Sequence, residues 1–224
     1  MGDSVLITRL SSASWFKICY KDSVIHLDPG FFEERSAIFQ KLDKKANLIL
    51  ISHPHHDHIK EEILAEIADD KTEIITVKDA ITSKVDKLHL VKADDEIYAV
   101  DIKIKAIPAY NTPAGHSTRK YHPLGFGVGY VLSIGDKRIY FAGDTDLIKE
   151  MENLGDIDIA FLPIGGTYVM DFGEALEAVK TIKPRIVIPM HEFKQSLCEF
   201  KKSVERETSS LAFVINPGES ISIK

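Results

Sequence analysis

A short polar run at the end of an apolar segment constrains this chain more than any other feature. Residues 48–52 (LILIS) form an apolar stretch, and residues 53–58 (HPHHDH) follow directly. Imidazole nitrogens and carboxylate oxygens are donors that zinc accepts, at about 2.0–2.2 Å. His53 and His55 can point to one side and share an ion, whereas Asp57 and His58 face a second ion where the chain turns. The run therefore predicts two metal ions side by side at a strand end.

A solvated polar loop is the weaker interpretation of this run. Four of the nine histidines fall within these six residues, which chance clustering explains poorly.

Other ligand types stand at the ends of other apolar runs. Asp144 follows 139–143 (IYFAG) and His191 follows 185–190 (RIVIPM), while His116 and His122 lie between two strand-like segments. Asp144 could bridge two cations or cap a helix that begins near Asp146. A lone histidine such as His191 is often a core or edge residue. The repetition of ligand types at several strand ends favours a metal site.

Together these segments resemble the metallo-β-lactamase superfamily, and within it the small metal-dependent hydrolases similar to L-ascorbate-6-phosphate lactonases. Besides 53–58, the resemblance rests on 28–29 (DP), 108–111 (PAYN), 121–123 (YHP), 127–130 (GVGY), 139–146 (IYFAGDTD), 162–167 (LPIGGT) and 188–191 (IPMH). It implies an α/β fold, a four-layer αββα sandwich of two mixed sheets with helices outside and the metals at one edge.

The resemblance also implies seven metal ligands. They are His53, His55 and His122 for one ion, Asp57, His58 and His191 for the other, and Asp144 as the bridge. His122 is preferred to His116 because related sequences carry a His-Pro pair just before the glycine-rich strand. His116 then lines the pocket. Asp28 either supports a ligand from behind or simply ends its strand before Pro29.

One segment departs from the related sequences. Relatives carry Gly-His-Ala-Ser near the N-terminus, whereas this chain reads SSAS at 11–14, with Ser12 at the place of the histidine. That histidine is not among the principal ligands, so the predicted metal site is retained. The transfer of a substrate from the relatives is weakened.

Two bridged cations predict hydrolytic chemistry. Water held between them loses a proton near neutral pH, and the hydroxide attacks a carbonyl or phosphoryl centre. Asp57 would orient that hydroxide. We expect a hydrolase acting on a small lactone, ester or phosphodiester-like substrate, with zinc as the first choice of metal and manganese or iron as alternatives. The alternative functions are a non-hydrolytic metalloprotein with a redox or binding role and a nuclease of the same superfamily.

Four further residues are candidates for the substrate cleft. Gly165 and Gly166 could hold an anionic substrate with backbone N–H groups, or form an ordinary tight turn. Tyr110 and Tyr168 could line the cleft, although aromatic residues in loops are as often packing groups.

Length and hydropathy predict one α/β domain over residues 1–224, which two similar halves could build. The chain has 224 residues, of which 44% are hydrophobic, and no linker-like segment divides it. Periodicity predicts strands near 5–9, 15–20, 24–28, 48–52, 100–107, 127–134, 138–142, 158–162, 186–190 and 211–215, and helices near 60–69, 173–182 and 195–207.

Charge and hydropathy restrict the partners. A net charge of −6 argues against a broad nucleic-acid surface. No apolar stretch approaches the ~20 residues of a membrane span, so we expect a cytoplasmic protein without a membrane partner. The expected partner is a small-molecule substrate, with an anionic substrate and a homo-oligomer left open. Cys19 and Cys198 are far apart in the sequence and are expected to stay reduced.

Overall fold

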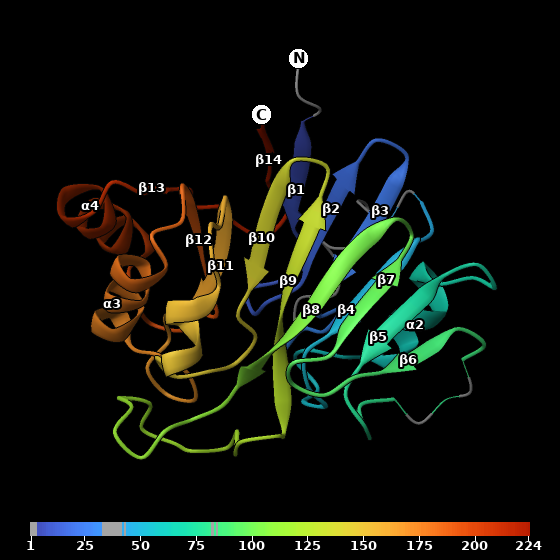
Figure 1. Ribbon diagram of the computed structural model, residues 1–224, viewed down its shortest axis with the longest axis horizontal. Coiled ribbons are helices and arrows are strands. Elements are labelled where there is room, and N and C mark those ends of the chain that lie inside the picture. Colours follow the sequence, from blue (N-terminus) through green and yellow to red (C-terminus); the bar gives the residue numbers. More distant parts are fainter. Residues whose placement is uncertain (1–3, 33–41, 43, 82, 84) are drawn as a thin grey trace. The chain divides into compact units, whose positions relative to one another are not determined.

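Two seven-stranded mixed sheets carry most of the secondary structure in the computed structural model (Figure 1). The structure describes residues 4–32, 42, 44–81, 83 and 85–224. The chain divides into two compact units: Met1–Val91, Tyr98–Ile102 and Ile215–Lys224 form the first, and Lys92–Ile97 and Lys103–Val214 form the second. The single domain expected for residues 1–224 stays a prediction.

The first unit contains a sheet whose order is β14-β1-β2-β3-β4-β5-β6. Its strands are β1 (Val5–Arg9), β2 (Phe16–Tyr20), β3 (Ser23–Leu27), β4 (Leu48–Ile51), β5 (Glu73–Thr76), β6 (Leu88–Leu90) and β14 (Ser220–Ile223). The first four in this order pair antiparallel, and β3 to β6 pair parallel. Every residue of β4 is buried, as expected for a central parallel strand. The run 53–58 therefore leaves the carboxyl end of a buried parallel strand.

Helix α2 (Glu61–Ile67) follows that run and connects β4 to β5. Ile63, Leu64 and Ile67 lie on its buried face. The spacing of one, three and four residues places these side chains on one stripe of the helix. The ligand run is thus held between a buried strand and a helix anchored by apolar contacts.

The second unit contains a sheet whose order is β13-β12-β11-β10-β9-β8-β7. Its strands are β7 (Glu96–Ala99), β8 (Ile102–Ala109), β9 (Gly127–Ile134), β10 (Lys137–Phe141), β11 (Ile159–Pro163), β12 (Ile186–Met190) and β13 (Leu211–Ala212). β8, β9 and β10 pair antiparallel, whereas β10 to β13 pair parallel. The carboxyl ends of β10 and β12 and the amino end of β9 consequently share one edge of this sheet.

Three helices in the second unit pack on apolar residues of this sheet. They are the 3-10 helix η2 (Lys149–Asn153), α3 (Phe172–Ile182) and α4 (Leu197–Glu207). Their buried side chains form one core cluster with residues of β10, β11 and β12. The helices α3 and α4 lie side by side (Figure 1), and the rings of Phe172 and Phe200 meet edge-on at 5.4 Å. Among the described residues, no helix is long and apolar enough to cross a membrane.

Side-chain caps explain where α3 and α4 begin. Asp171 accepts a hydrogen bond from the backbone N–H of Glu174, and Ser196 accepts one from Glu199. Such caps satisfy backbone donors that the first helical turn leaves without partners. At the other end of α3, Lys183 adopts a left-handed conformation with φ of 55° and stops the helix.

All ten predicted strands and all three predicted helices are present, within a few residues of the expected bounds. Four strands were missed: β5, β6, β7 and β14. β6 and β7 are three and four residues long and contain exposed positions, so their apolar pattern is weak. β14 reads SISI and alternates serine with isoleucine over only four residues. These strands form because a neighbouring strand offers backbone hydrogen bonds, a cause that a local pattern does not contain.

Candidate metal centre

The first ligand set is the run that connects β4 to α2. His53 Nε2 lies 3.0 Å from His55 Nδ1, and His58 Nε2 lies 3.4 Å from Asp57 Oδ2. Two ligands of one tetrahedral zinc ion lie roughly 3.3–3.6 Å apart when each bond is about 2.0–2.2 Å. Each pair thus has close to the spacing that one shared ion requires.

Asp28, directly after β3, fixes the orientation of His58. Its buried carboxylate accepts hydrogen bonds from the N–H and the hydroxyl of Ser52, both at 2.6 Å. Asp28 Oδ2 also lies 2.6 Å from His58 Nδ1. Burial raises the pKa of Asp28, and the contacts with His58 and Ser52 oppose that rise. A carboxylate on Nδ1 leaves Nε2 of the histidine available to a metal, so Asp28 does more than end its strand.

The N-terminal segment reaches the first ligand set through Ser14. Its hydroxyl lies 3.0 Å from His58 Nδ1. The fully buried Arg9 holds this segment, donating hydrogen bonds to the carbonyl oxygens of Ser11 at 2.9 Å and Ser12 at 2.6 Å. Ser12 therefore contributes a carbonyl oxygen to this support. The sequence analysis missed Ser14 and Ser52, because neither is itself a metal-ligand type.

The second ligand set is centred on Asp144, which follows β10 and Gly143. Asp144 Oδ2 lies 3.4 Å from His122 Nε2 and 3.5 Å from His191 Nε2. All three side chains are buried. η2 begins after Ile148 and has no side-chain cap, so Asp144 does not serve as a helix cap. Its carboxylate lies near both imidazoles, as a shared ligand would.

Asn111 holds His122 in place. The side-chain oxygen of Asn111 accepts a hydrogen bond from the His122 backbone N–H at 2.9 Å. His122 Nδ1 lies 3.1 Å from the carbonyl oxygen of Tyr168 and 3.2 Å from Asn111 Oδ1. Both neighbours are acceptors, so Nδ1 carries the proton and Nε2 is available on the side of Asp144. The sequence analysis gave Asn111 no role, although the PAYN segment that contains it was part of the resemblance.

His191 lies in a strained segment. His191 and Phe193 have positive φ values of 51° and 46°, and such conformations cost of order 1–3 kcal/mol each. Gly165 makes room for this segment, because an added Cβ would lie 2.4 Å from the His191 carbonyl oxygen. Gly166 donates its N–H to Met170 at 2.9 Å, so that group serves the turn.

His116 belongs to a different cluster from His122. Its Nδ1 lies 3.0 Å from Asp171 Oδ2, and the two residues group with Glu174 at the start of α3. His122 is therefore the histidine that stands beside Asp144 in this unit.

The two tyrosines proposed for the substrate cleft differ in their surroundings. Tyr168 stacks on Tyr121 with ring centroids 5.2 Å apart and lies 5.9 Å from Phe193, whose ring is 4.8 Å from that of His191. Tyr110 instead donates its hydroxyl to Glu150 and packs against the apolar core of the unit. Tyr168 thus lies among residues next to the ligands, whereas Tyr110 is engaged in packing.

His26 is a histidine of the core. It is fully buried in β3, and Trp15 Nε1 donates a hydrogen bond to its Nδ1 at 2.9 Å. Burial, assisted by the charge of Lys17, lowers the pKa of His26 to about 3. The imidazole is therefore neutral at physiological pH and serves the packing of the first unit.

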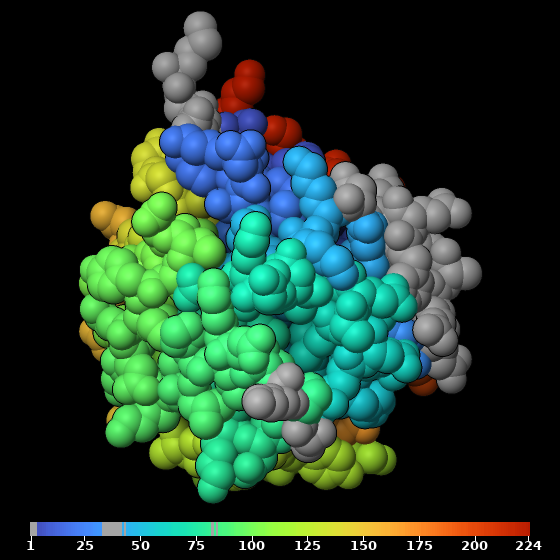
Figure 2. All heavy atoms as spheres, turned by 90° about the vertical axis from the view of Figure 1, so that its right-hand side faces the viewer, coloured from blue at the N-terminus to red at the C-terminus, as the bar shows by residue number. Residues whose placement is uncertain are grey.

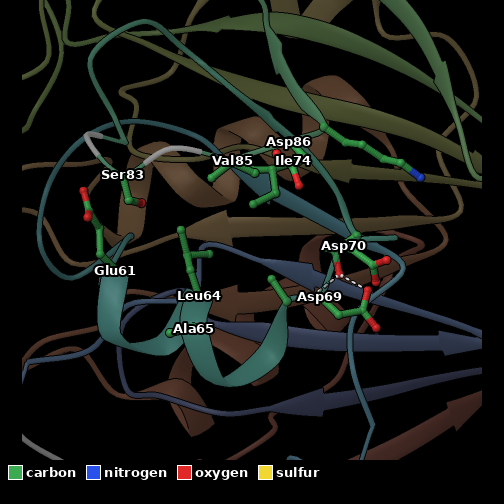
Figure 3. Close-up of a pocket in the computed structure, with 12 residues that line it drawn as sticks. Glu61, Leu64, Ala65, Asp69, Asp70, Ile74, Ser83, Val85 and Asp86 are labelled. Atoms are coloured by element: carbon green, nitrogen blue, oxygen red, sulfur yellow. Dashed lines mark hydrogen bonds between the residues drawn. The ribbon is translucent and has the colours of Figure 1, made fainter.

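Each unit also contains a cavity. In the first unit a cavity of about 400 Å³ lies between α2 and β5, in the cyan-to-teal segment that faces the viewer in Figure 2. Figure 3 shows Leu64, Ala65 and Ile74 among the carboxylates that surround it. None of its lining residues belongs to the ligand sets. In the second unit a cavity of about 650 Å³ is lined by residues that include His116, Gly166, Asp171, Phe193 and Lys194.

Comparison with known proteins gives the family of this chain. The family model of the β-lactamase superfamily domain matches residues 6–191. A UPF0173 metal-dependent hydrolase from Pelotomaculum thermopropionicum is 33% identical over 89% of this chain and 92% of the relative. A protein of the same description from Methanosarcina mazei is 31% identical over 97% of this chain and 98% of the relative.

Solved structures agree with this result. One from Parabacteroides distasonis shares 32% identity and a TM-score of 0.84, over 96% of this chain and 94% of the other. Igni18, a metallo hydrolase from Ignicoccus hospitalis, shares 27% identity and a TM-score of 0.80 over 99% of both chains. The fold class that the sequence predicted is thereby confirmed. The chain belongs to the metallo-β-lactamase superfamily, and its relatives are metal-dependent hydrolases.

Proposed function

We propose that this protein is a dinuclear metal-dependent hydrolase whose metal ligands are the residues of the two ligand sets. The substrate class is a small lactone, ester or phosphodiester-like molecule, and zinc is the first choice of metal, with manganese and iron as alternatives. We also propose that, within the superfamily, the chain belongs to the branch that is similar to L-ascorbate-6-phosphate lactonases. Membership in the superfamily supports it, as does the donor chemistry of each set.

One observation carries the proposal. In each set a buried histidine is held through its Nδ1 by an oxygen acceptor, Asp28 for His58 and the Tyr168 carbonyl for His122. In each case Nε2 lies about the same distance from a carboxylate oxygen, 3.4 Å. Buried histidines fixed in this tautomer are characteristic of metal ligands with supporting hydrogen bonds.

The bound ions would lower the pKa of water and polarise the bond under attack. The chain's own residues would supply the geometry. Asp57 would accept a hydrogen bond from the attacking water and orient it. Asp144 would be a ligand shared by both ions, because its carboxylate lies within 3.5 Å of the imidazoles of His122 and His191. Asp28 and Asn111 would prevent rotation of His58 and His122 during turnover.

The substrate side of the proposal rests on residues near His191. Tyr121 and Phe193 are large aromatic side chains with 54% and 43% exposure. The guanidinium of Arg119 lies 5.9 Å from the ring of Tyr168, and contacts with Tyr121 and Tyr168 raise its pKa, so it stays charged. We propose that these side chains, with Gly165 and Lys194, receive a substrate that carries an anionic group.

Metal analysis combined with turnover tests this proposal. Chain purified without chelator or affinity-tag metal is reconstituted with zinc and assayed on lactone, ester and phosphodiester probes. His58→Ala and Asp144→Ala should each lose at least one equivalent of zinc and most of the turnover, while circular dichroism stays that of the native chain. His56→Ala is the matched control, because His56 is in the same run but exposed. Unchanged zinc content and full turnover in the two ligand variants would refute the proposal.

A further inference from the structure

Three potential ligands meet in the second unit, apart from the residues placed in the proposed centre. Ligand atoms of His116, Asp171 and Glu174 lie within 4.8 Å of one another. His116 comes from the loop before Ser117, whereas Asp171 is the N-cap of α3 and Glu174 lies in its first turn. The donor set is one imidazole and two carboxylates, a combination that divalent zinc and manganese accept.

The loop that carries His116 is fixed by a buried aspartate. Asp146 Oδ2 accepts hydrogen bonds from the Thr112 N–H at 2.8 Å and from Lys120 Nζ at 3.0 Å. Lys120 also donates to the Gly115 carbonyl oxygen at 2.7 Å. At Gly115 an added Cβ would lie 2.1 Å from Asp146 Oδ2, so the loop is seated tightly. The loop that carries His116 is therefore held in place by hydrogen bonds with Asp146 and Lys120.

The hydrogen bonds that fix this loop leave one carboxylate oxygen of Glu174 without a partner among the described residues. Its side chain is only 7% exposed, and among the residues the structure describes its Oε2 has no hydrogen-bond partner. In a capping box the glutamate at this position reaches back to the N-cap N–H, but here its carboxylate takes a backbone hydrogen bond from His116. A buried carboxylate oxygen without a hydrogen-bond partner is unfavourable, because it has lost its contact with water.

Negative charge accumulates around Glu174. Burial raises the pKa of the Glu174 carboxyl, the contact with His116 opposes that rise, and the charges of Asp146 and Asp171 add to it. Lys120 is already engaged by Asp146. A metal cation at Glu174 would offset this charge and would also have ligand atoms of His116 and Asp171 within reach.

We propose that His116, Asp171 and Glu174 form a further binding site for a divalent transition metal, with zinc as the expected ion. The Nδ1 of His116 and Oδ2 of Asp171 are 3.0 Å apart, close to the spacing of two ligands on one ion. Their side chains are 58% and 36% exposed, so water completes the coordination and the ion exchanges with solvent.

The site forms part of the wall of the 650 Å³ cavity, to which His116 and Asp171 both contribute. A cation there would tie the loop of residues 112–118 to the start of α3 and add positive charge to the cavity wall. That charge favours an anionic ligand in the cavity. The proposal stands on this cluster alone and does not depend on hydrolytic activity.

Zinc titration of the chelator-treated full chain tests the site. Bound zinc is measured by equilibrium dialysis for the natural chain, for Glu174→Gln and for His116→Ala. Each variant should bind one equivalent less than the natural chain at a free zinc concentration that saturates it, or bind that equivalent at least tenfold more weakly. The control is Glu177→Gln, an exposed glutamate of the same helix that pairs with Lys180, and it should bind like the natural chain.

A further variant, Asp144→Ala, distinguishes zinc binding at this site from zinc binding at the proposed catalytic centre. In Asp144→Ala the additional equivalent should persist, and the side-chain ¹⁵N resonances of His116 should still shift on zinc addition. A chain that loses zinc in Glu174→Gln but not in Asp144→Ala would keep this site and refute the proposed dinuclear centre. Zinc binding unchanged in both Glu174→Gln and His116→Ala would overturn the site. Loss in His116→Ala alone would overturn it too, because a three-ligand site requires Glu174.

Discussion

The two ligand sets are constructed in opposite ways. In the first unit all four ligands come from six consecutive residues after one strand, and a turn brings them together. In the second unit His122, Asp144 and His191 lie near the ends of three different strands of one sheet, and only the order of β9, β10 and β12 brings them near one another. A contiguous set depends on local geometry, whereas a dispersed set depends on the register of a whole sheet. Perturbations should therefore affect the two sets differently.

The largest expected effect concerns the partners that orient the histidines. Asp28→Asn should lower the affinity for the zinc ion that His58 is proposed to hold by about 10–100-fold, a typical cost for the loss of a carboxylate behind a metal-binding histidine. Asparagine tolerates the positive φ of 43° at this position, so the change removes charge rather than the backbone conformation. Zinc titration measures the loss of zinc affinity, and thermal unfolding measures any change in the stability of the fold.

Asn111→Ala is the matched change in the second set. It removes a neutral acceptor while the Tyr168 carbonyl still holds His122 Nδ1, so the expected loss is smaller than for Asp28→Asn. An equal or larger loss in Asn111→Ala would contradict this expectation, because the neutral acceptor would then support its histidine at least as strongly as the carboxylate does.

A smaller effect is expected where the backbone of the dispersed set passes Gly165. Gly165→Ala places a methyl group 2.4 Å from the His191 carbonyl oxygen and 2.4 Å from Phe193 Cδ2. Overpacking of this kind costs about 1–3 kcal/mol, and His191 should shift away from Asp144. The free energy of unfolding and the zinc affinity should both fall.

Gly173→Ala is its control, because the added Cβ meets nothing closer than 3.4 Å and alanine favours the helix α3. If Gly165→Ala behaves like Gly173→Ala, the close approach at residue 165 does not position His191.

The effect that is smallest at neutral pH concerns the core histidine of the first unit. The pKa of His26 is lowered from 6.5 to about 3, so between these values the unfolded chain binds a proton that the folded chain does not. The free energy of unfolding should therefore fall as pH falls through this range, by up to about 1.4 kcal/mol per pH unit. In His26→Asn, which keeps an acceptor for Trp15 Nε1, this slope should decrease. The same slope in both chains, from denaturant titrations at pH 4 to 7, would assign the acid sensitivity to other groups.

The difference between a contiguous and a dispersed ligand set explains which parts of the site could be predicted from the sequence. The run 53–58 was predicted to bind metal from its residues alone, because its candidate ligands are adjacent. The choice between His116 and His122 rested on a resemblance, since both are histidines in one long connection. Ser14, Ser52 and Asn111 were missed because hydroxyl and amide groups occur throughout the chain, and only the fold places these three beside a ligand. β6 and β7 were missed for a different reason: they are short and contain exposed positions, so their sequences show no clear strand pattern.

The support of His58 has a consequence for how the protein would exchange a bound metal. Asp28, Ser52 and Ser14 hold this histidine through hydrogen bonds made entirely within the chain. A site that is already assembled gains little folding energy from an ion, unlike a zinc finger, which is unfolded without one. Removal and replacement of the metal should therefore be reversible without refolding, and the supply of ions in the surroundings would determine which metal the protein carries.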